Sequence, residues 1–273
     1  MKSRAEIKAL AKETMGKQRG TSILIVLVMG ALYIPVIILA MVALIVSMAS
    51  GLFVLGWALY IAVLLLGPLI IYIMMVNGAG EYVKIYRQQP ANLGTLFTGL
   101  GVNFWRKLGG LLWMNLWLLI WTLPAIAVYV IGLVGPWLTG QSFWLSLTPL
   151  ALPLYIFVYI KWLSYSMTLF ILADSPHVKA TQALKLSKQI TNGHKGKLFV
   201  LQLSFIGWLM LSGLTYYILY IVYVGPYMYT TYAGFYEELR KNAMEEGRVS
   251  RWDLDKGEDG TDRGRGFGIG IDS

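Results

Sequence analysis

The chain has no cysteine, only two histidines, and few charged residues: 14% of its 273 residues are Asp, Glu, Lys or Arg. Without cysteine it forms no disulfide, no thiolate nucleophile and no cysteine-ligated metal site. We expect no metal and no cofactor, because two histidines alone provide too few ligands. Soluble domains carry about 25% charged residues, which disfavours a water-exposed globule of this size.

Long apolar runs are what the sequence has instead, and 57% of its residues are hydrophobic. A helix needs about 20 apolar residues to cross the hydrocarbon core of a bilayer. Four runs reach that length, and they cover residues 22–49, 52–76, 108–134 and 143–173. The chain is therefore expected to cross a membrane several times.

The last apolar stretch, residues 198–236, is too long for one untilted span and short for two. A turn at Gly213 would divide it into spans near residues 198–213 and 216–236. Charge favours this division. Six spans with the N-terminus inside place 22 of the 23 Lys and Arg residues, and all 14 Asp and Glu residues, in cytoplasmic segments. The sequence thus predicts an all-α, polytopic membrane helix bundle with six transmembrane helices and both termini cytoplasmic.

The segments before the predicted hairpins resemble one another. Residues 3–19 and 176–191 both predict basic amphipathic helices, and residues 93–107 carry a weaker copy. This pattern is typical of three repeats, each an interfacial helix followed by a helical hairpin, with the apolar face against lipid and the lysines towards anionic headgroups. The alternative is that these segments are not repeats, because any basic amphipathic helix before a span has this pattern.

The domain division follows composition. Residues 1–246 form the predicted transmembrane domain with its interfacial cytoplasmic helices. Residues 247–273 are polar and rich in glycine, so we expect a disordered cytoplasmic tail that cannot fold alone. Its last residues could instead serve as a docking peptide.

The net charge of +9 indicates which kind of partner the protein binds. In a soluble protein it would suggest nucleic acid. Here the basic residues stand at the ends of apolar runs, so we expect membrane lipids with anionic headgroups and no nucleic acid. A protein partner at the cytoplasmic face is a further possibility.

Lys161 is the exception to the charge pattern, because it lies roughly 16 Å inside the fourth span at the helical rise. A charged residue at that depth is costly and suggests a functional site. Lys161 could contact an anionic ligand or a lipid phosphate, bond to Asn115 or Gln202, lose its proton, or snorkel to the interface. These three residues are the ligand-binding candidates.

Three further candidates lie on the cytoplasmic side. Asp174 and His177 could form an acid–base or ligand pair, but Asp174 or Ser175 could equally cap the helix that Pro176 opens. His194 lies in a basic loop before the fifth span. No predicted span or external turn carries an Asp, Glu, His or Cys, so no catalytic residue is assigned and we do not expect an enzyme.

Several short motifs are shared with a known family. They are Arg-Ala-Glu-Ile-Lys at residues 4–8, Asp-Ser-Pro at 174–176, Ala-Leu-Lys-Leu-Ser at 183–187, Gly-His-Lys at 193–195, Leu-Ser-Phe-Ile-Gly-Trp at 203–208, Pro-Tyr at 226–227 and Tyr-Ala-Gly-Phe-Tyr-Glu-Glu-Leu at 232–239. Over about residues 1–240 the chain resembles the domain of unknown function 975 family of bacterial membrane proteins. The resemblance implies a six-helix, multi-pass protein of a Gram-positive plasma membrane and brings no established activity.

Three functions remain open at this point. The first is a membrane protein that binds or moves a lipid, a hydrophobic molecule or an anionic small molecule between its helices. The second is a scaffold or regulatory subunit that recruits partners at the cytoplasmic face. The third, ranked last, is an enzyme with a cytoplasmic site at Asp174 and His177.

Overall fold

The computed structural model describes residues 1–51, 53–250, 253 and 254, and within these ranges every regular element is a helix. The elements in chain order are α1 (Arg4–Lys17), α2 (Arg19–Ala31), α3 (Tyr33–Ser50), α4 (Phe53–Tyr86), α5 (Gly94–Thr98), α6 (Phe104–Thr139), η1 (Ser142–Leu150), α7 (Ala151–Tyr165), α8 (Thr168–Asp174), α9 (Ala180–Thr191), α10 (Lys195–Leu214), η2 (Tyr220–Val224) and α11 (Gly225–Glu245). The predicted all-α class is confirmed.

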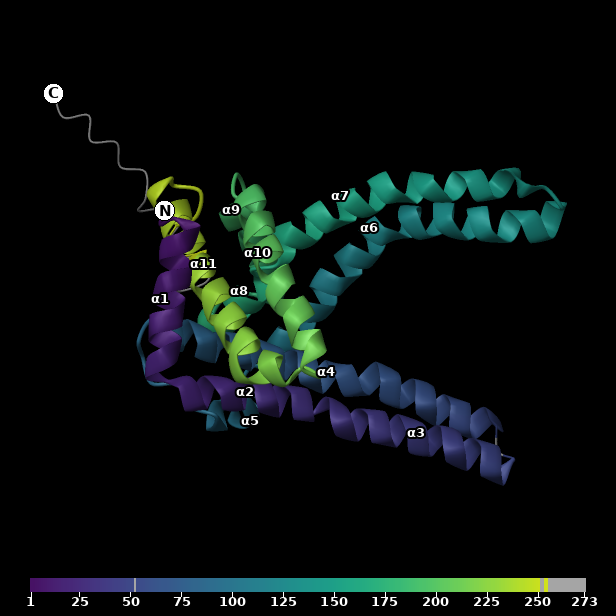
Figure 1. Cartoon of the computed structure of the whole chain (residues 1–273), viewed down its shortest axis with the longest axis horizontal. Coiled ribbons are helices and arrows are strands. Elements are labelled where there is room, and N and C mark those ends of the chain that lie inside the picture. The colour runs from purple at the N-terminus through teal and green to yellow at the C-terminus, as the bar shows by residue number, and fades with distance from the viewer. Residues whose placement is uncertain (52, 251–252, 255–273) are drawn as a thin grey trace.

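Two long hairpins project from one end of the molecule (Figure 1). One arm consists of α2 and α3 paired with α4, and the other of α6 paired with η1 and α7. At the opposite end, α1, α5, α8, α9 and α11 gather around the near ends of α4 and α6, and we call this part the base. In this view α10 and α11 run at a steep angle to both arms.

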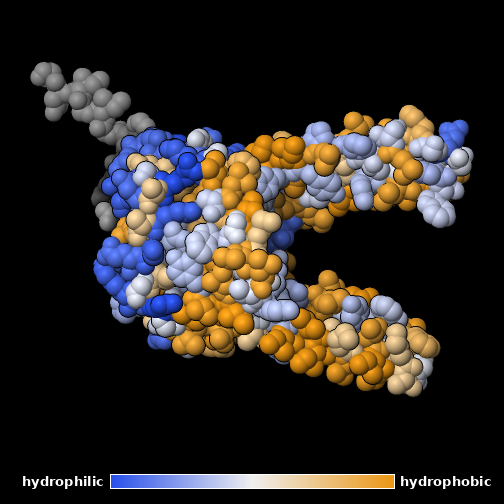
Figure 2. Space-filling model, in the orientation of Figure 1, coloured by the Kyte–Doolittle hydropathy of each residue, from blue (hydrophilic) through white to orange (hydrophobic). Residues whose placement is uncertain are grey.

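Polarity follows this division. Figure 2 shows hydrophilic residues concentrated on the base and hydrophobic residues over most of both arms. Apolar side chains on the arms stand exposed, for example Val54 at 87% and Trp137 at 91%. Exposed apolar surface of this extent is typical of protein that contacts lipid.

Five segments among the described residues are long and apolar enough to cross a membrane. They are Arg19–Ser50, Phe53–Tyr86, Phe104–Thr139, Ser142–Asp174 and Lys195–Leu214. The sixth predicted span is also helical and forms η2 and α11, but it does not reach the same hydropathy. The polytopic helical architecture is confirmed, and the count of six is approximate.

The turn that divides the last stretch lies a few residues beyond the predicted Gly213. It falls at Tyr216 and Tyr217, whose φ angles of 49° and 63° are left-handed. The backbone N–H of Tyr217 donates to the carbonyl of Ser212 at 2.9 Å, so the turn satisfies one of the free carbonyls at the end of α10.

Small residues allow the two helices of each arm to pack closely. A Cβ added at Gly56 of α4 would lie 1.9 Å from the Cβ of Ser47 in α3. A Cβ at Gly135 of α6 would lie 2.4 Å from the Trp144 ring of η1. Close backbone approach at small residues is the usual packing of membrane helices, where burial of apolar surface drives little association.

The amphipathic helix predicted at residues 3–19 is present as α1. Ser3 and Glu6 form a capping box at its start, in which the N–H of Glu6 donates to the Ser3 hydroxyl at 3.2 Å and the N–H of Ser3 donates to the Glu6 carboxylate at 2.7 Å. Its apolar residues Ile7 and Ala11 are fully buried against protein, mainly α11 and α4. The apolar face of α1 is therefore covered by the chain itself, which differs from the expectation that it lies on lipid.

A helix precedes each hairpin, as the repeat hypothesis requires: α1 before α2–α4, α5 before α6–α7, and α9 before α10–α11. The middle helix is only five residues long. The third begins at Ala180, with Lys179 as its N-cap, rather than at Pro176. The prediction that Asp174 or Ser175 caps it is wrong, because Asp174 ends α8 and its carboxylate is bound by arginines.

The predicted tail, residues 247–273, lies for the most part outside the described residues. Of those described, Val249 and Leu254 are 2% and 0% exposed and belong to the hydrophobic core of the base. The packed region thus continues past residue 246, the boundary set from composition.

Candidate functional site

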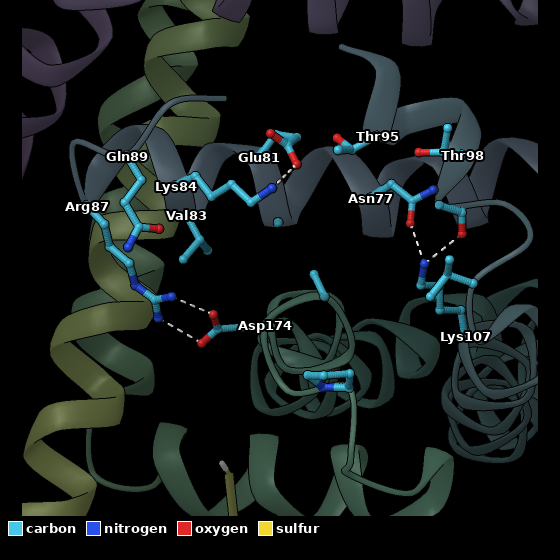
Figure 3. Close-up of a pocket in the computed structure, with 15 residues that line it drawn as sticks. Asn77, Glu81, Val83, Lys84, Arg87, Gln89, Thr95, Thr98, Lys107 and Asp174 are labelled. Atoms are coloured by element: carbon cyan, nitrogen blue, oxygen red, sulfur yellow. Dashed lines mark hydrogen bonds and ion pairs between the residues drawn. The ribbon is translucent and has the colours of Figure 1, made fainter. Parts of the chain in front are cut away.

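A polar cavity of about 450 Å³ lies in the base between α4, α5, α6 and the end of α8. Its polar lining residues are Asn77, Glu81, Lys84, Arg87, Gln89, Thr95, Thr98, Lys107 and Asp174. Figure 3 shows Arg87 and Asp174 at one end of this cavity and Asn77 and Lys107 at the other. The cavity exists because the chain turns back between α4 and α6 and carries α5 over their ends.

Lys107 is buried, with 8% of its surface exposed. Its ammonium donates to the side-chain oxygen of Asn77 at 2.7 Å and to the carbonyl of Gly99 at 2.8 Å. Asn77 in turn donates its amide to the carbonyl of Leu96 at 2.9 Å. Both acceptors of Lys107 are neutral, and the structure gives it no carboxylate within ion-pair distance in the ranges it describes.

Glu81 and Lys84 occupy the wall between the two ends. The Lys84 ammonium lies 2.7 Å from the Glu81 carboxylate, whose second oxygen accepts the N–H of Asn92 at 2.8 Å. Glu81 is 3% exposed and Lys84 is 40% exposed. The Glu81 charge is therefore matched by its own neighbour on α4.

Asp174 is the centre of an ion cluster that joins three helices. Arg87, just after α4, binds it bidentately at 2.6 and 2.8 Å, and Arg240 of α11 lies 3.3 Å away. The Tyr236 hydroxyl donates to the same carboxylate at 3.2 Å, and Arg87 also pairs with Glu237. Although burial disfavours the Arg87 charge, hydrogen bonds and attraction from Asp174, then Glu237, raise the pKa of Arg87 above its usual value.

Arg106 binds the backbone in the last turn of α8 and just beyond it. Its guanidinium donates to the carbonyls of Leu172 at 2.6 Å, Val178 at 2.9 Å and Ser175 at 3.2 Å. Because the last carbonyls of a helix lack intrahelical partners, a cation at this position satisfies them and complements the helix dipole. Arg106 thus fixes the segment that carries Asp174.

A second cavity, of about 300 Å³, lies deeper among α4, α6, α7, α8, α10 and α11. It is mostly apolar and contains four methionines, and it is lined by Met75, Ala79, Met114, Trp162, Tyr165, Ser166, Met167, Leu169, Phe170, Leu198, Gln202, Met228, Tyr229 and Tyr232. Asn77 of α4 lines the polar cavity and Ala79 of α4 lines the apolar one, so α4 forms a wall of both cavities.

The three ligand-binding candidates from the sequence are not brought together. Lys161 lies in α7 with its ammonium 4.2 Å from the Trp121 ring centre and 5.0 Å from that of Phe157. Asn115 donates to the carbonyl of Leu111 at 2.9 Å and faces a shallow groove of α6. Gln202 lines the apolar cavity, and its side-chain oxygen accepts a hydrogen bond from the Tyr159 hydroxyl.

The two histidines are also separate from the ion cluster. His177 is exposed in the turn after α8, while Asp174 is bound by arginines instead. His194 is the N-cap residue of α10, and its Nε2 lies 2.5 Å from the side-chain oxygen of Asn242. No group of three metal-ligating side chains occurs within the residues described.

Lys107, Arg87, Arg106 and Arg240 are the functional candidates that sequence reasoning missed. The sequence places all four among the basic residues at the ends of the apolar runs, which are expected to face anionic headgroups. One signal was available: Asn77 is a polar residue at the end of a long apolar run and needs a partner if it is buried. Which residue supplies that partner depends on how α5 folds back.

The fold, the exposed apolar arms and the polar base together define a polytopic helical membrane protein. Residues 1–243 match the family described as Protein of unknown function (DUF975), and the chain belongs to that family. The resemblance found in the sequence is confirmed. Among curated proteins and among solved structures, no match to this chain was found.

Proposed function

We propose that this protein is a non-enzymatic plasma-membrane protein that binds the apolar part of a lipid or another hydrophobic molecule in the 300 Å³ cavity. The lining of that cavity carries the proposal. Small-molecule sites are mostly apolar, of about 300–1,000 Å³, with a few polar groups that fix orientation. Here Gln202 and the tyrosines would supply those polar groups.

Methionine supports this assignment. Its unbranched, polarisable side chain adapts to irregular apolar ligands and is enriched at binding surfaces of broad specificity. Met75 of α4, Met114 of α6, Met167 just before α8 and Met228 of α11 line the cavity from four separate segments. A flexible acyl chain suits such a lining better than a rigid polar substrate.

The test is photo-crosslinking of the full chain in nanodiscs with a phospholipid that carries a diazirine in its acyl chain. We expect adducts on cavity peptides such as those containing Met228 and Tyr232. Met114→Trp would fill the cavity and reduce these adducts several-fold. Leu112→Trp, on the same helix but exposed, is the matched control and should leave them unchanged.

Equal labelling of the cavity in wild type and Met114→Trp would refute the proposal. Labelling confined to the exposed arms would refute it as well, since annular lipid contacts any membrane protein. Capture of a protein at the base, with no cavity labelling, would favour the scaffold function instead.

The proposed orientation has both termini in the cytoplasm. It is supported by the positive-inside tendency, because the basic residues gather on the base and the turns near Gly51, Gly140 and Tyr216 carry none. The absence of cysteine makes the test direct. A cysteine introduced at Ser3 should resist an impermeant thiol reagent in intact cells, whereas one at Ser142 should react. The reverse result would overturn the orientation.

A further inference from the structure

The polar cavity holds one positive charge that no carboxylate of the described residues balances. Lys107 is more than nine-tenths buried, yet its two hydrogen-bond acceptors, Asn77 and Gly99, are neutral. An ammonium has three donors, and only two are used by the residues that the structure describes. Burying a charge without an opposite charge is costly, so such a group normally has a partner.

The carboxylates of the cavity do not serve as that partner. Glu81 pairs with Lys84, and Asp174 is held by Arg87 at the far end of the cavity (Figure 3). Lys84 also lines the cavity and uses one of its donors on Glu81. The cavity therefore contains three cationic and two anionic side chains, with the surplus at the end that Lys107 occupies.

We propose that this cavity binds a phosphoryl group, with the Lys107 ammonium as its buried charge and Lys84 as a second cation. Lysine is a common phosphate ligand, acting as a compact point charge with several donors. The volume of about 450 Å³ holds a phosphorylated molecule rather than a bare ion. The phosphoryl group comes either from a soluble compound or from the headgroup of a phospholipid.

This site is independent of the proposed acyl-chain cavity. The two cavities lie on different sides of α4, because Asn77, Gly80 and Glu81 line one and Met75 and Ala79 the other. Gly80 lies close to α8, where an added Cβ would stand 3.3 Å from the Ala173 side chain. A substitution at a residue that lines one cavity therefore does not replace any residue that lines the other.

The test uses the full chain in an uncharged detergent, with inorganic phosphate titrated by calorimetry. A parallel arm uses native mass spectrometry of the chain released from phosphatidylcholine nanodiscs that contain phosphatidylglycerol. Lys107→Met should weaken binding by about tenfold to a hundredfold, the loss expected for one charged hydrogen bond. Lys185→Met removes the same charge from an exposed position on α9 and is the control.

A second variant tests the site without disturbing the contacts of Lys107. Thr98 is exposed at the edge of the cavity, so Thr98→Glu adds a negative charge there. Phosphate binding should weaken through repulsion, whereas Thr181→Glu, at an exposed position of α9, should have no effect. This pair remains informative if Lys107→Met fails to fold.

The arms separate the two sources of the phosphoryl group. Phosphate binding that both site variants weaken supports the proposal with a soluble ligand. Retention of phosphatidylglycerol without phosphate binding, weakened by the same variants, supports it with a lipid headgroup. Absence of binding in both arms, or binding that Lys107→Met and Thr98→Glu leave unchanged, overturns it and leaves Lys107 as a tether for α5.

Discussion

The ion cluster around Asp174 leads us to expect a large loss of stability from Asp174→Asn, which replaces one carboxylate oxygen by nitrogen. Asp174→Asn keeps the shape of the side chain but removes the negative charge that Arg87 and Arg240 share. Asp174 is 11% exposed, Arg87 27% and Arg240 17%. Removing one partner of a fully buried ion pair costs about 3–5 kcal/mol.

Two features of the site reduce that figure. The cluster is only partly buried, so solvent screens the charges that remain. Arg87 also keeps its pair with Glu237 when Asp174 is neutralised. We therefore expect Asp174→Asn to lower the free energy of unfolding by about 2 kcal/mol.

The assay is reversible unfolding in mixed micelles, followed by tryptophan fluorescence, together with a double-mutant cycle. If the pair is coupled, Arg87→Met should cost less in the Asp174→Asn background than in the wild type, by about 1–2 kcal/mol. The control is Glu245→Gln, which breaks an exposed pair with Lys241 at 3.8 Å and should cost under about 0.5 kcal/mol. A cost for Asp174→Asn no greater than that of the control would refute the reasoning.

Three further outcomes follow from the packing and are measured by thermal unfolding in detergent. Arg106→Met should cost about 2–3 kcal/mol, because it removes the guanidinium that donates to the carbonyls of Leu172, Ser175 and Val178, and an unchanged melting temperature would contradict this role. Gly56→Leu should destabilise the α3–α4 arm because its side chain would collide with Ser47, whereas Gly30→Leu, with nothing within 4 Å, should not. Lys161→Met should change stability by no more than about 1 kcal/mol, since its cation–π contacts are exchanged for apolar packing; a larger loss would show that the charge itself is needed.

The structure changes the interpretation of the most conspicuous residue in the sequence. Lys161 is the one basic residue inside a predicted span, and the sequence leaves open whether it contacts an anionic ligand or a lipid phosphate, bonds to Asn115 or Gln202, loses its proton or snorkels to the interface. Its ammonium instead lies over the Trp121 and Phe157 rings, and aromatic faces attract a cation without any carboxylate. The buried lysine beside a polar cavity is Lys107, at the start of α6.

The amphipathic segments show the same limit of sequence reasoning. Hydrophobic periodicity predicts that residues 3–19 and 176–191 form helices with one apolar face, and α1 and α9 confirm this. Periodicity does not say whether lipid or protein covers that face. In the structure α11 and α4 cover α1, so its residues Ile7 and Ala11 are part of the core.

The sequence by itself determined the membrane class, the helical fold, the family and the segregation of charge, because span length, hydropathy and charge are local properties of a chain. Only the tertiary structure decided which charges meet. Asp174 meets Arg87 and Arg240 from segments 87 and 66 residues away, and Lys107 reaches Asn77 from 30 residues away. Because α5 lies over the ends of α4 and α6, Lys107 is a buried charge that no carboxylate of the described residues pairs with, rather than a basic residue at the headgroups.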